Sequence, residues 1–297
     1  MSATGDIGTA KRSGGFREWV SNPWAQTRFL WVVGIGYAVW SLIPVAVAIL
    51  FSFNRTRSVT QWAGFSLRWY IWDPHESVLH NPALQHNILQ TLKLATITTI
   101  IAVPLGVAFG LALHRWRGRG SDSSNFLMLF SFVTPELILA VSLFLLFLNA
   151  FRFIGLGTTA QLIGLVVLAL AYPVIIVRAR LLSLGNSYEE AAMDLGASPS
   201  GALRRVTLPL LGPSIFASAA IIFAFALDDF LIAEQLARGA SDETVSMAIY
   251  VAARTAPIPA TNAIGTIMLT ASTLLILVAA LLFRRSNRKR GESVAVM

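Results

Sequence analysis

Long runs of apolar residues without a charged side chain are the feature that most constrains this chain. One run extends from Phe29 to Phe53, and several others reach the roughly 20 residues that an α-helix needs to cross a bilayer. Only 13% of the residues are charged, whereas a soluble domain has about a quarter. We therefore predict an all-α membrane protein with six transmembrane helices. The expected spans cover about residues 29–53, 86–113, 125–150, 158–178, 211–233 and 261–283, and Pro135-Glu136 interrupts the third. A basic loop at 114–124 is expected after the second span, and a polar loop at 235–261 before the sixth.

The polar ends of the chain delimit one membrane domain. Residues 1–28 are predicted to form a cytoplasmic N-terminal tail, residues 29–285 the six-span domain, and residues 286–297 a basic cytoplasmic C-terminal tail. The first apolar run is longer than the apolar region of a secretory signal, so we expect an uncleaved first span.

The distribution of lysine and arginine predicts the orientation. With both termini on one side of the membrane, that side carries sixteen basic residues and the other side carries six. Basic loops favour the cytoplasm. The net charge of +8 is therefore better explained by membrane orientation than by a nucleic-acid partner. The prediction is a multi-pass protein surrounded by membrane lipid.

The sequence contains no motif for hydrolysing ATP. The three lysines, Lys11, Lys93 and Lys289, follow Ala, Leu and Arg, so no glycine–lysine pair of a phosphate-binding loop exists. No nucleophile triad or metal-ligand spacing is recognisable, and the chain has no cysteine. Three histidines of one outer loop could suggest a metal site, but their irregular spacing favours ordinary solvated side chains. We expect no catalytic residue and no cofactor bound by this chain.

Residues 186–209 form a long polar interruption between two apolar runs. Asn186 or Ser187 can cap a helix, and Ser187 with Glu190 has the spacing of a capping box. Gly196 is suited to ending that helix, and Ser198-Pro199 to starting another. The pattern predicts two short helices that meet at a sharp angle on the cytoplasmic side.

This segment also resembles the EAA loop of ABC-importer permeases. Glu190-Ala191-Ala192, then Gly196 after three residues, then Val206-Thr207-Leu208-Pro209 after nine more, match the family pattern with a conservative Val. The resemblance implies a segment that docks into a cytoplasmic ATPase; the alternative is an ordinary loop helix. The residues expected to take part are Glu189, Glu190, Ala191, Ala192, Asp194, Gly196, Arg204, Arg205, Leu208 and Pro209.

Three further stretches resemble spermidine/putrescine-type permeases of the PotC type. They are WAGFSLRWY at 62–70, NILQTLKL at 87–94 and FALDDF at 225–230, the last with Ala226 where that family has serine. The resemblance implies the six-helix MetI-like fold in a bacterial inner membrane. It also implies a second, PotB-like permease, a PotA-like ATPase dimer that uses ATP and Mg, and an extracytoplasmic PotD-like binding protein.

Four acidic residues lie in or near the apolar spans. A carboxylate at the bilayer centre costs at least a few kcal/mol, so such residues usually face a pathway or a partner. Glu136, Asp228, Asp229 and Glu234 are therefore expected along the path of a cationic substrate. Alternatively, Glu136 pairs with Lys93. Asp228 and Asp229 point about 100° apart on a helix, so only one of them can face a single pore.

Two other functions remain open at this level. A permease of the same fold for sugar, thiamine or iron would carry the same EAA loop. An ion-coupled secondary transporter also uses acidic residues in the membrane, but it would not need the spacing of residues 190–209 and usually shows internal repeats. No repeat relates the two halves of this chain.

Overall fold

A computed structural model describes residues 27–115, 118, 123, 126, 130, 133–255 and 258–294. The chain divides into two units, residues 1–50 and 51–297, which are described separately. Most of the predicted N-terminal tail and most of the basic loop at 114–124 lie outside the described residues. The side chains of the predicted C-terminal tail are likewise not described, although its backbone is helical through Val294.

In its described residues, the first unit is one apolar helix. Helix α2 runs from Thr27 to Ser52 and includes Pro44. Its segment Leu30–Ser52 has a mean hydropathy of 2.1 and no charged residue, which makes it long and apolar enough to cross a membrane. The first predicted span is therefore confirmed as a helix.

The second unit is also helical in its described part. Apart from one isolated bridge between Asn54 and Phe65, no strand pairing occurs in the segments that the structure places. Two π-helical turns, η2 and η3, and one 3-10 turn, η4, interrupt the α-helices. In chain order the elements are η2 (Arg68–Trp72), α3 (Pro82–Arg115), α5 (Glu136–Asn149), α6 (Thr158–Ala169), α7 (Ala171–Leu184), α8 (Ser187–Asp194), α9 (Pro199–Ala202), η3 (Leu203–Thr207), α10 (Leu208–Asp228), α11 (Leu231–Leu236), η4 (Ala240–Asp242), α12 (Val245–Thr255) and α13 (Pro259–Val294).

Within the described residues, five stretches are long and apolar enough to cross a membrane. They are Leu30–Ser52, Pro82–Arg115, Thr158–Leu184, Pro199–Asp228 and Pro259–Val278. Helix α5 is apolar but has only 14 residues, because it begins directly after Pro135. The interruption predicted at Pro135 is thus confirmed. A sixth span would also need residues 125–132, most of which lie outside the described part.

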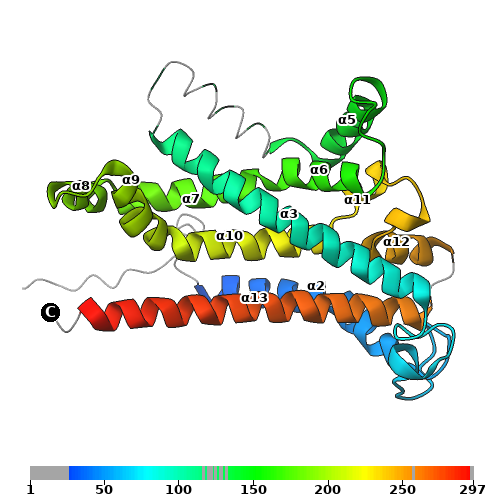
Figure 1. Cartoon of the computed structure of the whole chain (residues 1–297). Helices are drawn as coiled ribbons and strands as arrows, with labels where there is room; N and C mark the ends of the chain where they lie inside the picture. The colour runs from blue at the N-terminus through cyan, green and yellow to red at the C-terminus, as the bar shows by residue number, and fades with distance from the viewer. Residues whose placement is uncertain are drawn as a thin grey trace, which may run out of the picture. The chain divides into compact units, whose positions relative to one another are not determined.

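Helices α3, α7 and α10 form the centre of the second unit, as Figure 1 shows. Small residues let α3 and α7 approach closely. A Cβ atom on Gly106 would lie 2.2 Å from Cγ of Pro173, and one on Gly110 would lie 3.3 Å from the carbonyl oxygen of Val174. The surrounding core consists of Ala102, Val103, Val107, Ala169, Val177, Leu181, Leu211 and Ile222.

A second core joins α5, α6 and α11 to the middle of α3. Gly164 of α6 allows this contact, because a Cβ atom there would lie 2.7 Å from Leu236 and 2.8 Å from Ile232. The buried members of this core are Leu94, Ala140, Phe147, Ala160, Leu165, Ile232 and Leu236.

The predicted helix limits were wrong in three places. The fourth span is divided into α6 and α7 at Leu170, where Pro173 cannot donate a hydrogen bond back to Ala169. The fifth helix was expected to reach Ala233 but ends at Asp228, and α11 follows separately. The expected polar loop at 235–261 contains the helix α12.

The close contact of α3 with α7 predicts that Gly106→Ala destabilises the protein by about 1–3 kcal/mol, the usual cost of overpacking. The rigid Pro173 ring cannot rotate away from the added methyl group, which outweighs the better helix propensity of alanine. Reversible unfolding in mixed micelles would measure the change. Gly212→Ala on α10 is the matched control, since nothing lies within 4 Å of its Cβ position. Equal stability of both variants would contradict this packing.

Candidate functional site

The 186–209 segment contains the turn that its sequence predicts. Helix α8 ends at Asp194, and Gly196 follows with φ of +89°, in the left-handed region that favours glycine. Ser198 then caps α9, because its Oγ accepts a hydrogen bond of 3.2 Å from the N–H of Gly201. The predicted stop at Gly196 and the predicted start at Ser198-Pro199 are confirmed.

Two local predictions for this segment were wrong. The N-cap of α8 is Asn186, and no side-chain hydrogen bond caps this helix, so the capping box of Ser187 and Glu190 does not form. The second arm is also not a separate short helix. Helix α9 continues through the π-turn η3 directly into α10, so that Pro199–Asp228 is one apolar stretch of 30 residues.

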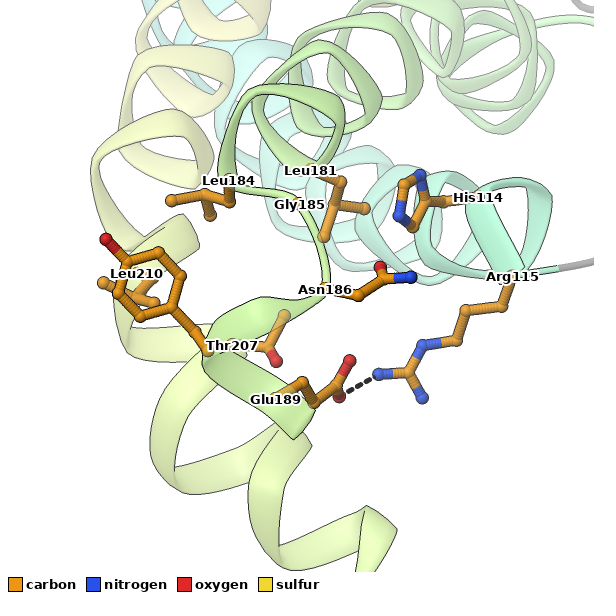
Figure 2. Close-up of a pocket in the computed structure, with 10 residues that line it drawn as sticks. His114, Arg115, Leu181, Leu184, Gly185, Asn186, Glu189, Thr207 and Leu210 are labelled. Atoms are coloured by element: carbon orange, nitrogen blue, oxygen red, sulfur yellow. Dashed lines mark hydrogen bonds and ion pairs between the residues drawn. The ribbon is translucent and has the colours of Figure 1, made fainter. Parts of the chain in front are cut away.

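Helix α8 is anchored by one ion pair, and none of its residues is buried. The Glu189 carboxylate forms an ion pair with Arg115 at the end of α3 (Figure 2). A small pocket of about 40 Å³ lies beside this pair, lined by His114, Leu181, Asn186 and Thr207 among others. The pair therefore connects the segment to the long helix α3.

The tip of the segment presents apolar side chains to its surroundings. No residue of α8 is buried, and the side chain of Leu195 beside Gly196 is 90% exposed. Tyr188 and Met193 are exposed as well. An exposed apolar tip on an otherwise polar segment is typical of a surface that a partner covers.

The residues expected to couple to an ATPase lie mostly on this exposed surface. Glu189, Ala192 and Leu208 are half-buried. The exposed members are Glu190, Ala191, Asp194, Gly196, Arg204, Arg205 and Pro209.

Two of the four predicted pathway acids meet in the structure. Glu136 is the first residue of α5, and its carboxyl group lies close enough to that of Asp229, which follows α10, for the two to interact. Asp229 is buried; its Oδ1 accepts a hydrogen bond of 2.9 Å from the N–H of Ala233. Its Oδ2 is buried without a hydrogen-bond partner in the described chain. The two acids thus form a carboxyl pair with one unsatisfied oxygen.

The other two acids lie elsewhere. Asp228, the last residue of α10, is exposed and lines a cavity between α10, α12 and α13. Glu234 is exposed on α11. The two aspartates do have different surroundings, but not for the reason expected: α10 ends at Asp228, so Asp229 does not lie on the same helix. The alternative ion pair of Glu136 with Lys93 is not formed among the described residues, and Lys93 is exposed on α3.

A buried polar network that was not predicted from the sequence holds α11 in place. Gln161 of α6 is completely buried, and its Nε2 donates to the carbonyl oxygens of Ala233 (2.9 Å) and Asp242 (3.0 Å). The Asp242 carboxylate accepts from the N–H and Oγ1 of Thr158, and Gln90 donates to Thr158 and Gln161. A glutamine within an otherwise apolar span was the signal that could have revealed it.

The loop between α2 and α3 is ordered by two polar residues. The Asn54 side chain bonds to the backbone of Ser58, Gln61 and Ala63, and the backbone carbonyl oxygen of Asn54 accepts from Nε1 of the buried Trp69 ring (2.6 Å). Asp73 accepts from two backbone N–H groups and pairs with Arg68 at 2.8 Å. The segment that resembles the polyamine permeases is therefore a folded cap on α12 and α13.

A known family matches the region that contains these features. Its profile, described as "Binding-protein-dependent transport system inner membrane component", matches residues 102–291. The chain belongs to this family. It is therefore a permease subunit of an ABC importer, an integral inner-membrane transport component and not an enzyme.

Relatives similar over nearly the whole permease carry more specific names. It is 30% identical to the spermidine/putrescine transport system permease protein PotC of Haemophilus influenzae, over 88% of this chain and 97% of the relative. It is 31% identical to the putrescine transport system permease protein PotI of Escherichia coli, over 93% of this chain and 96% of the relative.

A solved structure supports the fold. A chain of a bacterial ABC transporter involved in the import of the acidic polysaccharide alginate superposes with a TM-score of 0.70 at 17% identity, over 91% of this permease and 99% of that chain. At this identity the likeness concerns the MetI-like fold alone.

The loop between α2 and α3 also leads to a prediction about pH. Hydrogen bonds from the N–H groups of Glu76 and His75, together with Arg68, lower the pKa of Asp73 from 3.8 to about 2. A carboxyl group with a lowered folded pKa stabilises the fold above its unfolded pKa, and this contribution is lost as the pH falls through the folded pKa. The loop between α2 and α3 should therefore lose stability between about pH 4 and about pH 2.

Digestion of the detergent-solubilised permease with pepsin across this range would test the prediction. We expect cleavage within residues 54–81 to accelerate as the pH falls in the unsubstituted protein, and Asp73→Asn to be cleaved readily at both ends of the range. Glu76→Gln is the control, because Glu76 pairs with Arg57, whose side chain is 65% exposed. The idea fails if Asp73→Asn keeps the pH dependence of the unsubstituted loop.

Proposed function

We propose that this permease forms half of the translocation pathway of an ATP-driven importer for polyamines. The observation that carries the proposal is the meeting of Glu136 and Asp229 in a chain whose relatives are named for spermidine and putrescine. A polyamine carries several ammonium groups, and each of them can exchange its hydrogen bonds to water for hydrogen bonds to carboxylate oxygens. The unsatisfied Oδ2 of Asp229 is suited to such a donor, since a buried acceptor without a partner is costly.

The four acidic residues differ in how far their positions support a role in the pathway. Glu136 and Asp229 lie close enough to interact, and Asp228 lines a neighbouring cavity. Glu234 lies about one helical turn beyond the break that follows α10, and its part in the pathway rests on the sequence argument alone. All four remain members of the proposed pathway.

The proposed partners follow from the family and from the exposed segment. A PotA-like ATPase dimer would cover α8 and Leu195 from the cytoplasm and would supply the hydrolysis of ATP with Mg. A PotB-like permease would form the other half of the pathway, and a PotD-like binding protein would deliver substrate to the outer loop. In this arrangement both termini are cytoplasmic, residues 29–285 form the membrane domain, and residues 1–28 and 286–297 are tails.

The continuous helix from α9 to α10 suggests how ATPase movement reaches the substrate. Its first residues belong to the exposed segment, and its last residue is Asp228. Figure 1 shows α8 and α9 at one end of the second unit and α11 and α12 at the other. A displacement of the segment would move the end of α10, and with it the acids, as one body.

We expect Gly196→Val to uncouple ATP hydrolysis from transport or to release the ATPase. A β-branched residue is strongly disfavoured at φ of +89°, so the angle between α8 and α9 must change. ATPase activity and uptake would be measured together in proteoliposomes that contain the whole transporter. Gly155→Val is the control, because nothing lies within 4 Å of its Cβ position and its loop is remote from α8. A fully coupled Gly196→Val transporter would rule out this role.

We also expect Glu136→Gln and Asp229→Asn each to lower kcat/KM for spermidine or putrescine by roughly tenfold or more. The loss of one charged hydrogen-bond partner costs about 1.5–3 kcal/mol, and about 1.4 kcal/mol corresponds to a factor of ten. The amides keep the size of the side chains, and Asn can still accept from Ala233, so assembly should persist. Glu243→Gln, a nearby half-buried acid, is the control. Unchanged uptake in both variants would refute the acidic pathway.

A further inference from the structure

The cavity beside Asp228 has the chemistry of a binding site for an alkylammonium group. We propose that it holds one ammonium end and the adjoining methylene chain of the transported cation, with Asp228 as the counter-ion. The inference rests on the proposed function and assigns one substrate-binding position within the proposed pathway.

The cavity is large enough for an alkyl chain and is mostly apolar. It encloses about 320 Å³ between α10, α12 and α13, within the size range of small-molecule sites. Its polar groups are few: the Asp228 carboxylate and the hydroxyl groups of Ser246 and Ser272. The walls include Leu227, Ile249 and Met268.

The two neighbouring aspartates have different roles because their surroundings differ. Asp229 is held in place: its carboxylate accepts from the N–H of Ala233, and its carbonyl oxygen accepts a 2.6 Å hydrogen bond from Oγ of Ser246. Asp228 is exposed in the cavity, and no hydrogen bond or ion pair of its side chain occurs in the described part of the chain. It is therefore the aspartate that is free to follow a moving ligand.

The composition of the walls distinguishes between classes of ligand. A bare metal cation such as Ca²⁺ would require about six to eight oxygen ligands, and this cavity offers one carboxylate and two hydroxyl groups. A sugar would leave many of its hydroxyl groups unpaired against Leu, Ile and Met side chains. An alkylammonium ion matches both parts of the cavity, because the carboxylate binds the charge and the apolar walls cover the methylene groups.

Gly265 of α13 offers a way to fill the cavity without distorting its walls. A Cβ atom there would lie 3.6 Å from Cδ1 of Ile249, which is ordinary van der Waals contact. Gly265→Val should therefore take up space that a methylene chain needs. Gly212→Val on α10 adds the same volume at an open position outside the cavity.

The test uses the complete transporter, purified through a tag on this permease and reconstituted with its ATPase and binding protein. The measured quantity is the uptake of radiolabelled putrescine. We expect Asp228→Asn and Gly265→Val each to raise KM roughly tenfold, the effect of about 1.4 kcal/mol. Glu243→Gln and Gly212→Val should leave KM unchanged.

Competition by monoamines provides an independent measurement. In the unsubstituted transporter, n-butylammonium should inhibit putrescine uptake much more strongly than methylammonium, because the longer chain contacts the apolar walls. Gly265→Val should remove most of this difference. If that variant does not assemble with the ATPase, Ser272→Leu on the same wall replaces it.

The outcomes distinguish failure of the cavity assignment from failure of the proposed polyamine import. Normal putrescine uptake and unchanged chain-length preference in Asp228→Asn and Gly265→Val would overturn the cavity assignment and leave the polyamine importer intact. No uptake of any polyamine by the unsubstituted transporter would overturn both. A raised KM in the two cavity variants, with both controls normal, supports the site.

Discussion

The side chain of Asp229 closes a break in a membrane helix, and the acidic end of the permease depends on this interaction. Free backbone N–H groups are costly in an apolar environment, so a helix can be interrupted there only if other groups satisfy them. Here Oδ1 of Asp229 accepts from Ala233, and Ser246 donates to its carbonyl oxygen. This break separates α10 from α11, brings Asp229 to Glu136 and leaves Asp228 in the cavity.

The surrounding hydrogen-bond network restricts movement of the chain at this break. Gln161 donates to the carbonyl oxygen of Ala233, whose N–H group holds Asp229, and it also binds the backbone of Asp242. The short helix α11 is thus connected to α6 and to the loop before α12. On the other side, α10 is one continuous stretch back to the exposed segment beside Gly196. A rigid acidic end and an exposed opposite end, joined by one helix, fit a subunit that is moved by a partner.

The helices and turns that depend on neighbouring residues in the sequence were predicted correctly. The apolar runs predicted the long helices, Pro135 predicted the start of α5, and Gly196 with Ser198 predicted the turn between α8 and α9. The predictions that were wrong concern features that depend on contacts with other segments of the chain. The capping box of Ser187 is absent, while Glu189 pairs with Arg115 of α3. The end of α10 depends on Ser246 and Ala233, and helix α12 packs against α13.

The order of amino acids alone is enough to recognise a helical membrane protein without its own ATP-hydrolysing motif, and to place a bend at Gly196 within residues 186–209. Composition and φ preference are properties of each residue, so they can be recognised without knowing the fold. The three-dimensional fold was needed to learn which acids lie close together, which aspartate is held by hydrogen bonds and which one lines a cavity. Those properties depend on side chains of α5, α10, α11 and α12 that lie close together in the fold. The distances between these side chains cannot be read from their spacing along the chain.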